Sequence, residues 1–426
     1  MAGPFNAIVL AESPLARVRI AGLTARERAI RVARRVGATE VTVVDGDRSI
    51  LRTIAPGALL VIRADQLVHT PLVAPLAATT LASDAIAIAV GADDAYAGAL
   101  LAGPSAAADV IAALAAGRDD TAIAARATER VRHGEVACHP IATRDERRAA
   151  HRLLYRILIK PQDNAITRYL YRPVSLPVTK LLVWTPITPN QVSYLVGALV
   201  ALGCWLTAHA SMHYAIAGTA VILAASYLDC CDGEIARVKL LSSRFGAWID
   251  TVVDELSSVG YMVAIGWHCH LAFGPFYLGD LGFDPWLLAI VVGLVTYGWS
   301  MYCIYYNIIV GVGSANSQDY AGAFEVVPGE HPNSVRLRPK AVVTIKRALP
   351  RWLEVIATYA PYIVRRDFIS WCALAFAILH ITQVSFAALF AGGVVTAVIV
   401  TLDHVRLRRL RRSIARAGQV LESPSG

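Results

Sequence analysis

Hydrophobic and polar residues follow different patterns in the two halves of the 426-residue chain. In the first half, short apolar runs alternate with amphipathic segments. The segment 24–37, TARERAIRVARRVG, has helical periodicity and ends at a glycine. Strands alternating with helices predict a parallel sheet with helices on both faces, so residues 1–157 are expected to form a Rossmann-like α/β domain that is mostly helical after residue 107. The predicted buried strands are 6–11, 40–47, 58–65 and 85–93.

The second half contains long apolar runs. Most approach the ~20 residues that cross ~30 Å of hydrocarbon, so residues 191–412 are predicted to form an all-α domain of six transmembrane helices. Residues 413–426 are a tail. The connector 158–190 contains prolines and mixes aromatic with basic residues, which predicts short interfacial helices. The apolar segments are approximately 193–209, 213–233, 245–267, 286–312, 368–384 and 386–402.

Basic residues gather on one side of these predicted helices. The chain carries 40 Lys and Arg against 32 Asp and Glu, a net charge of +8. The turns at 209–213, 270–285 and 384–386 contain no Lys or Arg, whereas the other loops and the segment 406–416 are rich in them. The positive-inside rule predicts a multi-pass protein of the inner (cytoplasmic) membrane with both termini cytoplasmic. This distribution favours membrane lipids as partners and argues against nucleic acid.

Four carboxylates interrupt the second and third apolar segments. Asp229 and Asp232 are three residues apart, and Asp250 and Asp254 are four apart, so each pair shares one helix face. The short linker around 238–244 makes the two helices antiparallel, which brings the four carboxylates into one cluster. Oxygen-only ligands suit a hard cation, Mg²⁺ or Mn²⁺, as one ion or a pair. Ionisable groups inside membranes are functional by default, which disfavours a purely structural pairing with neighbouring basic residues.

The residues around the carboxylates predict a phosphate-bearing ligand. Gly233 and Gly246 remove side chains beside the cluster, and Ala236 is small for the same reason. Arg237 supplies a fixed cation suited to phosphate. Divalent metals, an arginine and open space together indicate a pyrophosphate-bearing substrate. In contrast, the His268–His270 segment and Cys230 and Cys231 are predicted to be structural.

The pattern Asp229-x2-Asp232-Gly233-x2-Ala236-Arg237-x8-Gly246-x3-Asp250-x3-Asp254 resembles, without a departure, the signature of the CDP-alcohol phosphotransferase family of integral membrane enzymes. The resemblance implies six membrane helices, a homodimer, and transfer from a CDP-linked donor to an acceptor hydroxyl with release of CMP at a cytoplasmic active site. By motif position, Asp229, Asp232 and Asp250 would ligate metal, and Asp254 would be both ligand and catalytic base. The residues that would line the CDP pocket are Gly233, Ala236, Arg237 and Gly246.

Two further stretches resemble one subgroup. DGEIAR (232–237) and KPQDNAITRYLYRPVS (160–175) resemble the bifunctional proteins that fuse an inositol-1-phosphate cytidylyltransferase to a di-myo-inositol-phosphate-phosphate synthase. This resemblance favours CDP-inositol as donor and an inositol phosphate or a lipid hydroxyl as acceptor. Arg365 and Arg366 could bind an acceptor phosphate, with a positive-inside anchor as the equal alternative. A CDP-diacylglycerol-dependent phosphatidyltransferase, a cation transporter and a non-catalytic scaffold are the alternatives.

The first domain resembles a nucleotidyltransferase, with Asp65 at the position of a metal-binding aspartate. It departs from that family in two places. The glycine-rich phosphate loop is replaced by AESPLARVRI (11–20), and the acidic element near the end of the domain by CHPIATRDERR (138–148). These departures predict a catalytically inactive domain that could still bind nucleotide or help assembly, with the CDP-alcohol made by a separate enzyme.

Overall fold

The computed structural model divides the chain into two compact units. The first comprises Met1–Pro189 and Cys231–Ser242, and the second comprises Asn190–Cys230 and Ser243–Gly426. The boundary falls within helix α8, Met212–Val238, so the last two turns of this helix belong to the first unit. The structure describes residues 4–159, 165–275, 277–278, 281–282, 284–313, 320–329, 331, 333–340 and 366–422.

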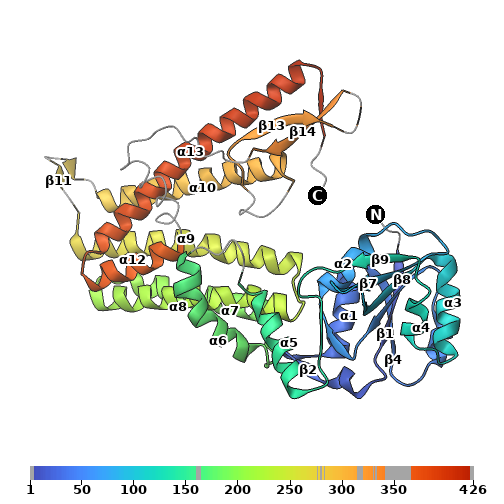
Figure 1. The fold of residues 1–426 in the computed structure, drawn as a ribbon. Helices are drawn as coiled ribbons and strands as arrows, with labels where there is room; N and C mark the ends of the chain where they lie inside the picture. Colours follow the sequence, from blue (N-terminus) through green and yellow to red (C-terminus); the bar gives the residue numbers. More distant parts are fainter. Residues whose placement is uncertain are drawn as a thin grey trace. The chain divides into compact units, whose positions relative to one another are not determined.

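A six-stranded sheet forms the centre of the first unit (Figure 1). All four predicted strands are confirmed, but the prediction of a parallel sheet is wrong. Strand β8 runs antiparallel to both neighbours, β5 and β7, and makes the sheet mixed. Its sequence, YAGALLA, is rich in alanine and glycine, which have low strand propensity, so the pattern did not reveal it. The order is β4 (Ala38–Val44), β1 (Phe5–Leu10), β5 (Ala58–Arg63), β8 (Tyr96–Ala102), β7 (Ile86–Val90) and β9 (Glu129–Arg132).

Helices cover both faces of this sheet, as predicted. Ala7 and Val9 of β1 point to the layer of α1 (Ala25–Arg35) and α2 (Thr70–Ala78). Ile8, between them, points to the opposite layer, formed by α3 (Pro104–Ala115) and α4 (Asp120–Ala124). The alternation follows from the two-residue period of a strand. Two separate apolar layers therefore stabilise the domain (Figure 1).

The region 107–157 is less helical than predicted. Strand β9 and the short strand β10, Cys138–Pro140, interrupt it. Helix α5, Arg144–Arg156, then begins at a capping box in which Thr143 and Glu146 bond each other's backbone N–H groups. The backbone groups of β9 and β10 form hydrogen bonds with the distant strands β7 and β6 (Gln66–Val68). Such pairing between distant segments cannot be predicted from the local sequence pattern.

Short helices form the connector, as predicted. A π-helical turn, η3 (Thr167–Tyr171), leads into α6 (Arg172–Leu182). Pro173 lies in the first turn of α6, where a missing N–H costs nothing. Pro177 lies inside the helix, so α6 continues past a residue that cannot donate a backbone hydrogen bond.

A helix covers each of the six predicted apolar segments in the described part of the second half. Four of them, α7, α8, α10 and α13, are long and apolar enough to cross a membrane. Helix α9 is long, but its most apolar stretch is more polar than those of these four helices, and α12 has only 13 residues. Six transmembrane spans therefore remain a prediction. The bounds are α7 Pro189–Thr207, α8 Met212–Val238, α9 Arg244–Phe273, α10 Pro285–Gly311, α12 Arg366–Ile378 and α13 Thr382–Arg416.

The turn between the last two helices lies earlier than predicted. Helix α12 ends at Ile378 and α13 begins at Thr382, whereas the apolar pattern placed the break at 384–386. His380 has a φ of 62°, a left-handed conformation that interrupts the helix. Near the C-terminal end of α13, β13 (Phe324–Pro328), β14 (Ser334–Pro339) and β15 (Val420–Leu421) form a small sheet.

Candidate metal site and adjoining cavity

The carboxylates of the site lie on two helices, α8 and α9, which are joined by a short linker. The uninterrupted apolar part of α8 ends at Leu228, directly before Asp229. Helix α9 is capped by Ser243, whose Oγ accepts a hydrogen bond from the Gly246 N–H at 2.9 Å. This cap fixes where α9 begins, so Asp250 and Asp254 follow one turn apart on one face.

Three of the predicted carboxylates meet in the second unit. Asp229, Asp250 and Asp254 are half-buried, and each offers an oxygen within 4.8 Å of the others. Like charges at this separation repel one another strongly unless a cation or a proton compensates them. An all-oxygen donor set of this kind fits Mg²⁺ or Mn²⁺ and not a softer metal. The predicted convergence of these three residues is therefore confirmed.

The fourth predicted ligand, Asp232, lies three residues further along α8, within the first unit. Its side chain is buried, and its carboxylate accepts a hydrogen bond from the Gly233 N–H. The group of three carboxylates found among the described residues does not include it. A role for Asp232 in metal binding stays a prediction.

Side-chain atoms lie close to both glycines of the motif. A Cβ atom on Gly246 would lie 2.9 Å from Asn190 Oδ1, so a larger residue here would displace the Asn190 side chain at the start of α7. A Cβ atom on Gly233 would lie 3.2 Å from Nη1 of Arg237, on the same helix face. Ala236 and Arg237 are half-buried on the same turn of α8. Their contact with CDP stays a prediction.

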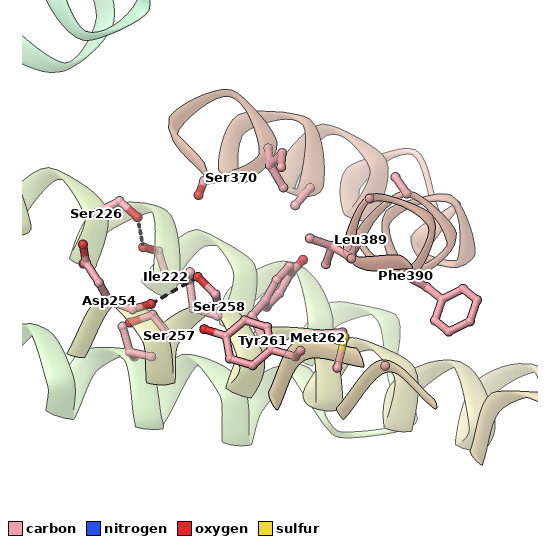
Figure 2. A pocket seen from close by; sticks show the side chains of 18 of the residues that line it. Ile222, Ser226, Asp254, Ser257, Ser258, Tyr261, Met262, Ser370, Leu389 and Phe390 are labelled. Carbon is pink, nitrogen blue, oxygen red and sulfur yellow. Dashed lines mark hydrogen bonds between the residues drawn. The ribbon is translucent and has the colours of Figure 1, made fainter. Parts of the chain in front are cut away.

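A cavity of about 280 Å³ adjoins the carboxylates within the second unit. Figure 2 shows that Asp254 and Ser226 lie at one end, and that the lining continues along α9 to Tyr261 and Met262. Leu389 of α13 lies near the far end, where the lining is largely apolar. Asp229 and Asp254 are the only charged residues among the described lining residues. The cavity therefore joins a charged end to an apolar interior.

The hydroxyl groups near the carboxylates are partly engaged by their own helices. Ser226 Oγ donates to the Ile222 carbonyl at 3.0 Å, and Ser258 Oγ donates to the Asp254 carbonyl at 3.1 Å (Figure 2). Such back-bonding satisfies the donors inside an apolar environment. Both serines line the cavity, and a hydroxyl oxygen that donates one hydrogen bond can still accept another from a ligand.

Two acidic side chains with protein partners, half-buried Glu255 and fully buried Glu234, were not assigned from the sequence. The Tyr297 hydroxyl, which lines the cavity, donates to the carboxylate of Glu255. Glu234 is fully buried, pairs with Arg172 of α6 and accepts a hydrogen bond from Ser175 Oγ at 2.9 Å. Both glutamates directly follow motif residues within apolar helices, and the cost of burying a charge was the signal that could have identified them.

In the α/β domain, the position predicted for a metal-binding aspartate is occupied by an ion pair. Asp65 Oδ1 accepts from Arg63 Nε at 3.1 Å, and this pairing raises the pKa of Arg63. Burial raises the pKa of nearby Asp120 to about 6, and its carboxylate accepts from the Tyr96 hydroxyl at 2.9 Å. The segment after β1 forms a single turn, η1 (Pro14–Arg17), where a glycine loop would be needed to surround a triphosphate.

The remaining predicted residues divide into structural and undescribed groups. His268 Nδ1 lies 2.6 Å from the His209 carbonyl, and His270 pairs with Asp284, so both histidines have protein partners. Buried Cys231 donates to the Ser175 carbonyl, which fits a packing role. Of the two arginines proposed for the acceptor, Arg365 lies outside the described residues, and only the backbone of Arg366, the first residue of α12, is described.

Comparison with known proteins relates the second half to one enzyme family. A family model described as CDP-alcohol phosphatidyltransferase matches residues 186–398, half of the chain. A bifunctional IPC transferase and DIPP synthase of Aquifex aeolicus is 31% identical over 138 residues, 32% of this chain and 29% of that protein. The protein of the same name from Thermococcus kodakarensis is 33% identical over 131 residues, 30% of this chain and 28% of that protein.

A shorter match carries a different name. A phosphatidylinositol phosphate synthase of Corynebacterium glutamicum is 33% identical over 91 residues, 21% of this chain and 41% of that protein. The chain thus spans less than half the length of each of these relatives.

Proposed function

Because the chain belongs to the CDP-alcohol phosphatidyltransferase family, we propose that it is a membrane phosphotransferase that moves a phosphoalcohol group from a CDP-alcohol to an acceptor hydroxyl. The observation that carries this proposal is the meeting of Asp229, Asp250 and Asp254 at the charged end of a cavity. CDP-inositol is the favoured donor, supported by the resemblance of the motif region to the bifunctional subgroup and by two relatives of that name.

Different side chains of the site would accept the proton, hold the metal and bind the donor phosphate. Asp254 accepts the proton of the acceptor hydroxyl, whose oxygen forms a bond to the β-phosphorus while the bond from that phosphorus to the CMP oxygen breaks. Asp229 and Asp250, with Asp254 and Asp232, would hold Mg²⁺ or Mn²⁺, expected as two ions. When bound, the metal would neutralise the charge of the pyrophosphate and of the leaving CMP. Arg237 would bind a donor phosphate, and Gly233, Ala236 and Gly246 would line the CDP pocket.

The cavity supports an acceptor that carries a lipid chain. Its charged end can hold a hydroxyl beside Asp254, while Ile222, Met262 and Leu389 offer an apolar surface to a hydrocarbon chain. An inositol phosphate would leave this apolar surface unused. The same cavity also supports the second candidate, a CDP-diacylglycerol-dependent phosphatidyltransferase, whose donor would place its acyl chains there. A cation transporter is less well supported, because Asp229 and Asp254 lie at one end and the other described lining residues are uncharged.

The first prediction concerns the reaction. Purified protein in lipid with Mg²⁺ and either labelled CDP-inositol or labelled CDP-diacylglycerol is expected to release CMP once a suitable acceptor is added. Diacylglycerol and ceramide should support more turnover than inositol phosphate, because only a lipid fills the apolar part of the cavity. Product analysis by thin-layer chromatography identifies the pair. Absence of CMP with both donors and every acceptor would contradict the proposed function.

We propose that the α/β domain does not make the donor. The pairing of Asp65 with Arg63 and the turn η1 in place of a glycine loop support this proposal. The second prediction is that the full chain forms no pyrophosphate from CTP and inositol-1-phosphate with Mg²⁺. An Asp254→Asn protein is the best sample, because it separates nucleotidyl transfer from CMP release. Pyrophosphate formed at the rate of an active cytidylyltransferase assayed alongside would show that the domain is an enzyme.

We also propose a location and an assembly. Four apolar helices support a multi-pass membrane protein. Placement in the inner membrane, with both termini and the active site cytoplasmic, rests on the distribution of Lys and Arg. A homodimer is expected from the family resemblance.

A further inference from the structure

The C-terminal end of α8 is held by the α/β domain within the first unit. Helix α8 ends at Val238, and two residues later Leu240 is only 8% exposed. Its side chain belongs to the apolar cluster between the sheet and α1, together with Ala29 and Val32 of that helix. Leu240 has a φ of 55°, so the chain turns sharply as this side chain enters the core. Within the first unit, the segment after α8 thus contributes a residue to the core of the α/β domain.

Two arginines of α1 bind the carbonyl groups of the last residue of α8 and of the residue directly after it. Nη1 of Arg28 donates to the Val238 carbonyl at 3.0 Å, and Nη1 of Arg31 donates to the Lys239 carbonyl at 2.7 Å. The final carbonyls of a helix have no partner within the helix and carry the negative end of its dipole. Arg28 is fully buried, and burial lowers its pKa to about 10, so it remains a cation at neutral pH. Within the first unit, cations of α1 therefore cap the end of α8.

The connector holds the same stretch from a second direction. Arg172 and Ser175 of α6 bind Glu234, the residue directly after Gly233. Nζ of Lys239 donates to the Thr185 carbonyl at 2.6 Å and to the Ile187 carbonyl at 3.0 Å. Contacts therefore lie on both sides of Arg237, within the ten residues 231–240.

We propose that the α/β domain is a clamp that positions the nucleotide-binding end of α8, with Arg28, Arg31 and Leu240 as positioning residues. The proposal rests on the proposed function, in which Gly233 and Arg237 contact the CDP moiety. The last turn of an unsupported helix frays, and every binding event would then have to order it at a cost in free energy. A helix end that is already ordered avoids this cost and therefore binds the nucleotide more tightly than a frayed one. The clamp would give a domain that lacks a triphosphate loop a function in the phosphotransferase reaction.

Loss of the clamp should therefore weaken nucleotide binding and leave the rate of the chemical step nearly unchanged. In Arg31→Met, the Lys239 carbonyl loses its charged donor, and we expect Kd for CMP with Mg²⁺ and KM for the CDP donor to rise about tenfold. Saturated kcat should stay within about twofold, because Asp254 is untouched. The double variant Arg28→Met/Arg31→Met should show a larger change in the same direction. Arg31→Lys keeps a cation and should recover most of the affinity.

Amide hydrogen exchange tests the clamp without any turnover. The N–H groups of Lys239 and Leu241 bond carbonyls of the last turn of α8, Ile235 and Ala236, so their exchange reports opening of this turn. Exchange should be at least about tenfold faster in Arg31→Met than in the wild type. Arg34→Met is the matched control, because Arg34 lies on the same helix and is exposed. It should change neither exchange nor CMP binding.

Each outcome decides the proposal. Unchanged exchange in both Arg31→Met and the double variant would show that no clamp exists. Faster exchange with unchanged Kd for CMP would show that the contact is structural and does not position the nucleotide site. Weaker binding in Arg34→Met to the same extent would attribute the effect to charge alone. If the wild type neither binds CMP nor releases it, the proposed function and the positioning role both fail, while the exchange rates still report whether α1 holds α8.

Discussion

Replacement of Asp254 by asparagine is expected to lower kcat by about 10²- to 10⁴-fold, the usual range for loss of a general base. Asparagine has the same shape but cannot accept the proton of the acceptor hydroxyl. Asp254 belongs to the three-residue group and, like Asp229, also lines the cavity, where Ser257 and Ser258 follow it on α9. Binding of CMP should change much less, because three of the four predicted nucleotide contacts, Gly233, Ala236 and Arg237, lie on α8. CMP release under saturating donor and equilibrium CMP binding measure the two quantities.

A matched control removes a carboxylate elsewhere in the membrane half. Asp284 is the N-cap of α10 and accepts from the Trp286 N–H at 2.9 Å. Asparagine caps a helix about as well as aspartate, and its amide group can still form a hydrogen bond with His270, so Asp284→Asn should fold normally and keep near-wild-type turnover. An Asp254→Asn protein that retains more than about a tenth of the wild-type kcat would remove Asp254 from the role of base.

Replacement of Asp250 by asparagine is expected to weaken metal binding by at least about tenfold, since affinity for hard divalent cations depends on the number of charged oxygen ligands. The substitution removes one of three carboxylates that lie within 4.8 Å of each other. It also relieves their mutual repulsion, so the protein should be at least as stable without metal as the wild type. Titration with Mn²⁺, followed by the electron paramagnetic resonance signal of the free ion, measures the affinity directly.

The neighbouring glutamate is the control for this measurement. Glu255 lies on the same helix, outside the three-carboxylate group, and its carboxylate accepts from Tyr297. Glu255→Gln should therefore bind Mn²⁺ as tightly as the wild type. Equal Mn²⁺ affinity in the wild type and Asp250→Asn would contradict the metal site. Equal losses in Asp250→Asn and Glu255→Gln would indicate a general effect of charge in α9.

The carboxylate group could largely be predicted because its geometry is local. Spacings of three and four residues place side chains on one helix face, and a short linker forces the next helix to return beside the first. The convergence of Asp229, Asp250 and Asp254 followed from these two facts. The long apolar helices and the four regular strands were predicted for the same reason, since hydrophobic periodicity reflects burial within a single element.

The remaining features depend on contacts between distant segments. Strand β8 is antiparallel because of its pairing with β5 and β7, and its alanine-rich sequence carries no sign of that direction. The cavity is lined by residues of α7, α8, α9, α10, α12 and α13, and its shape follows from how these helices pack. The bond from Arg28 to Val238 joins residues 210 positions apart.

The sequence by itself determined which helices carry charge and on which face, because neighbouring residues on a helix have fixed relative positions. Only the tertiary structure decided what those charged helices adjoin: an apolar cavity beside Asp254, and an α/β domain whose Arg28 and Arg31 bind the end of α8. The physical reason is that packing of side chains from separate segments depends on the whole fold, which no local pattern encodes.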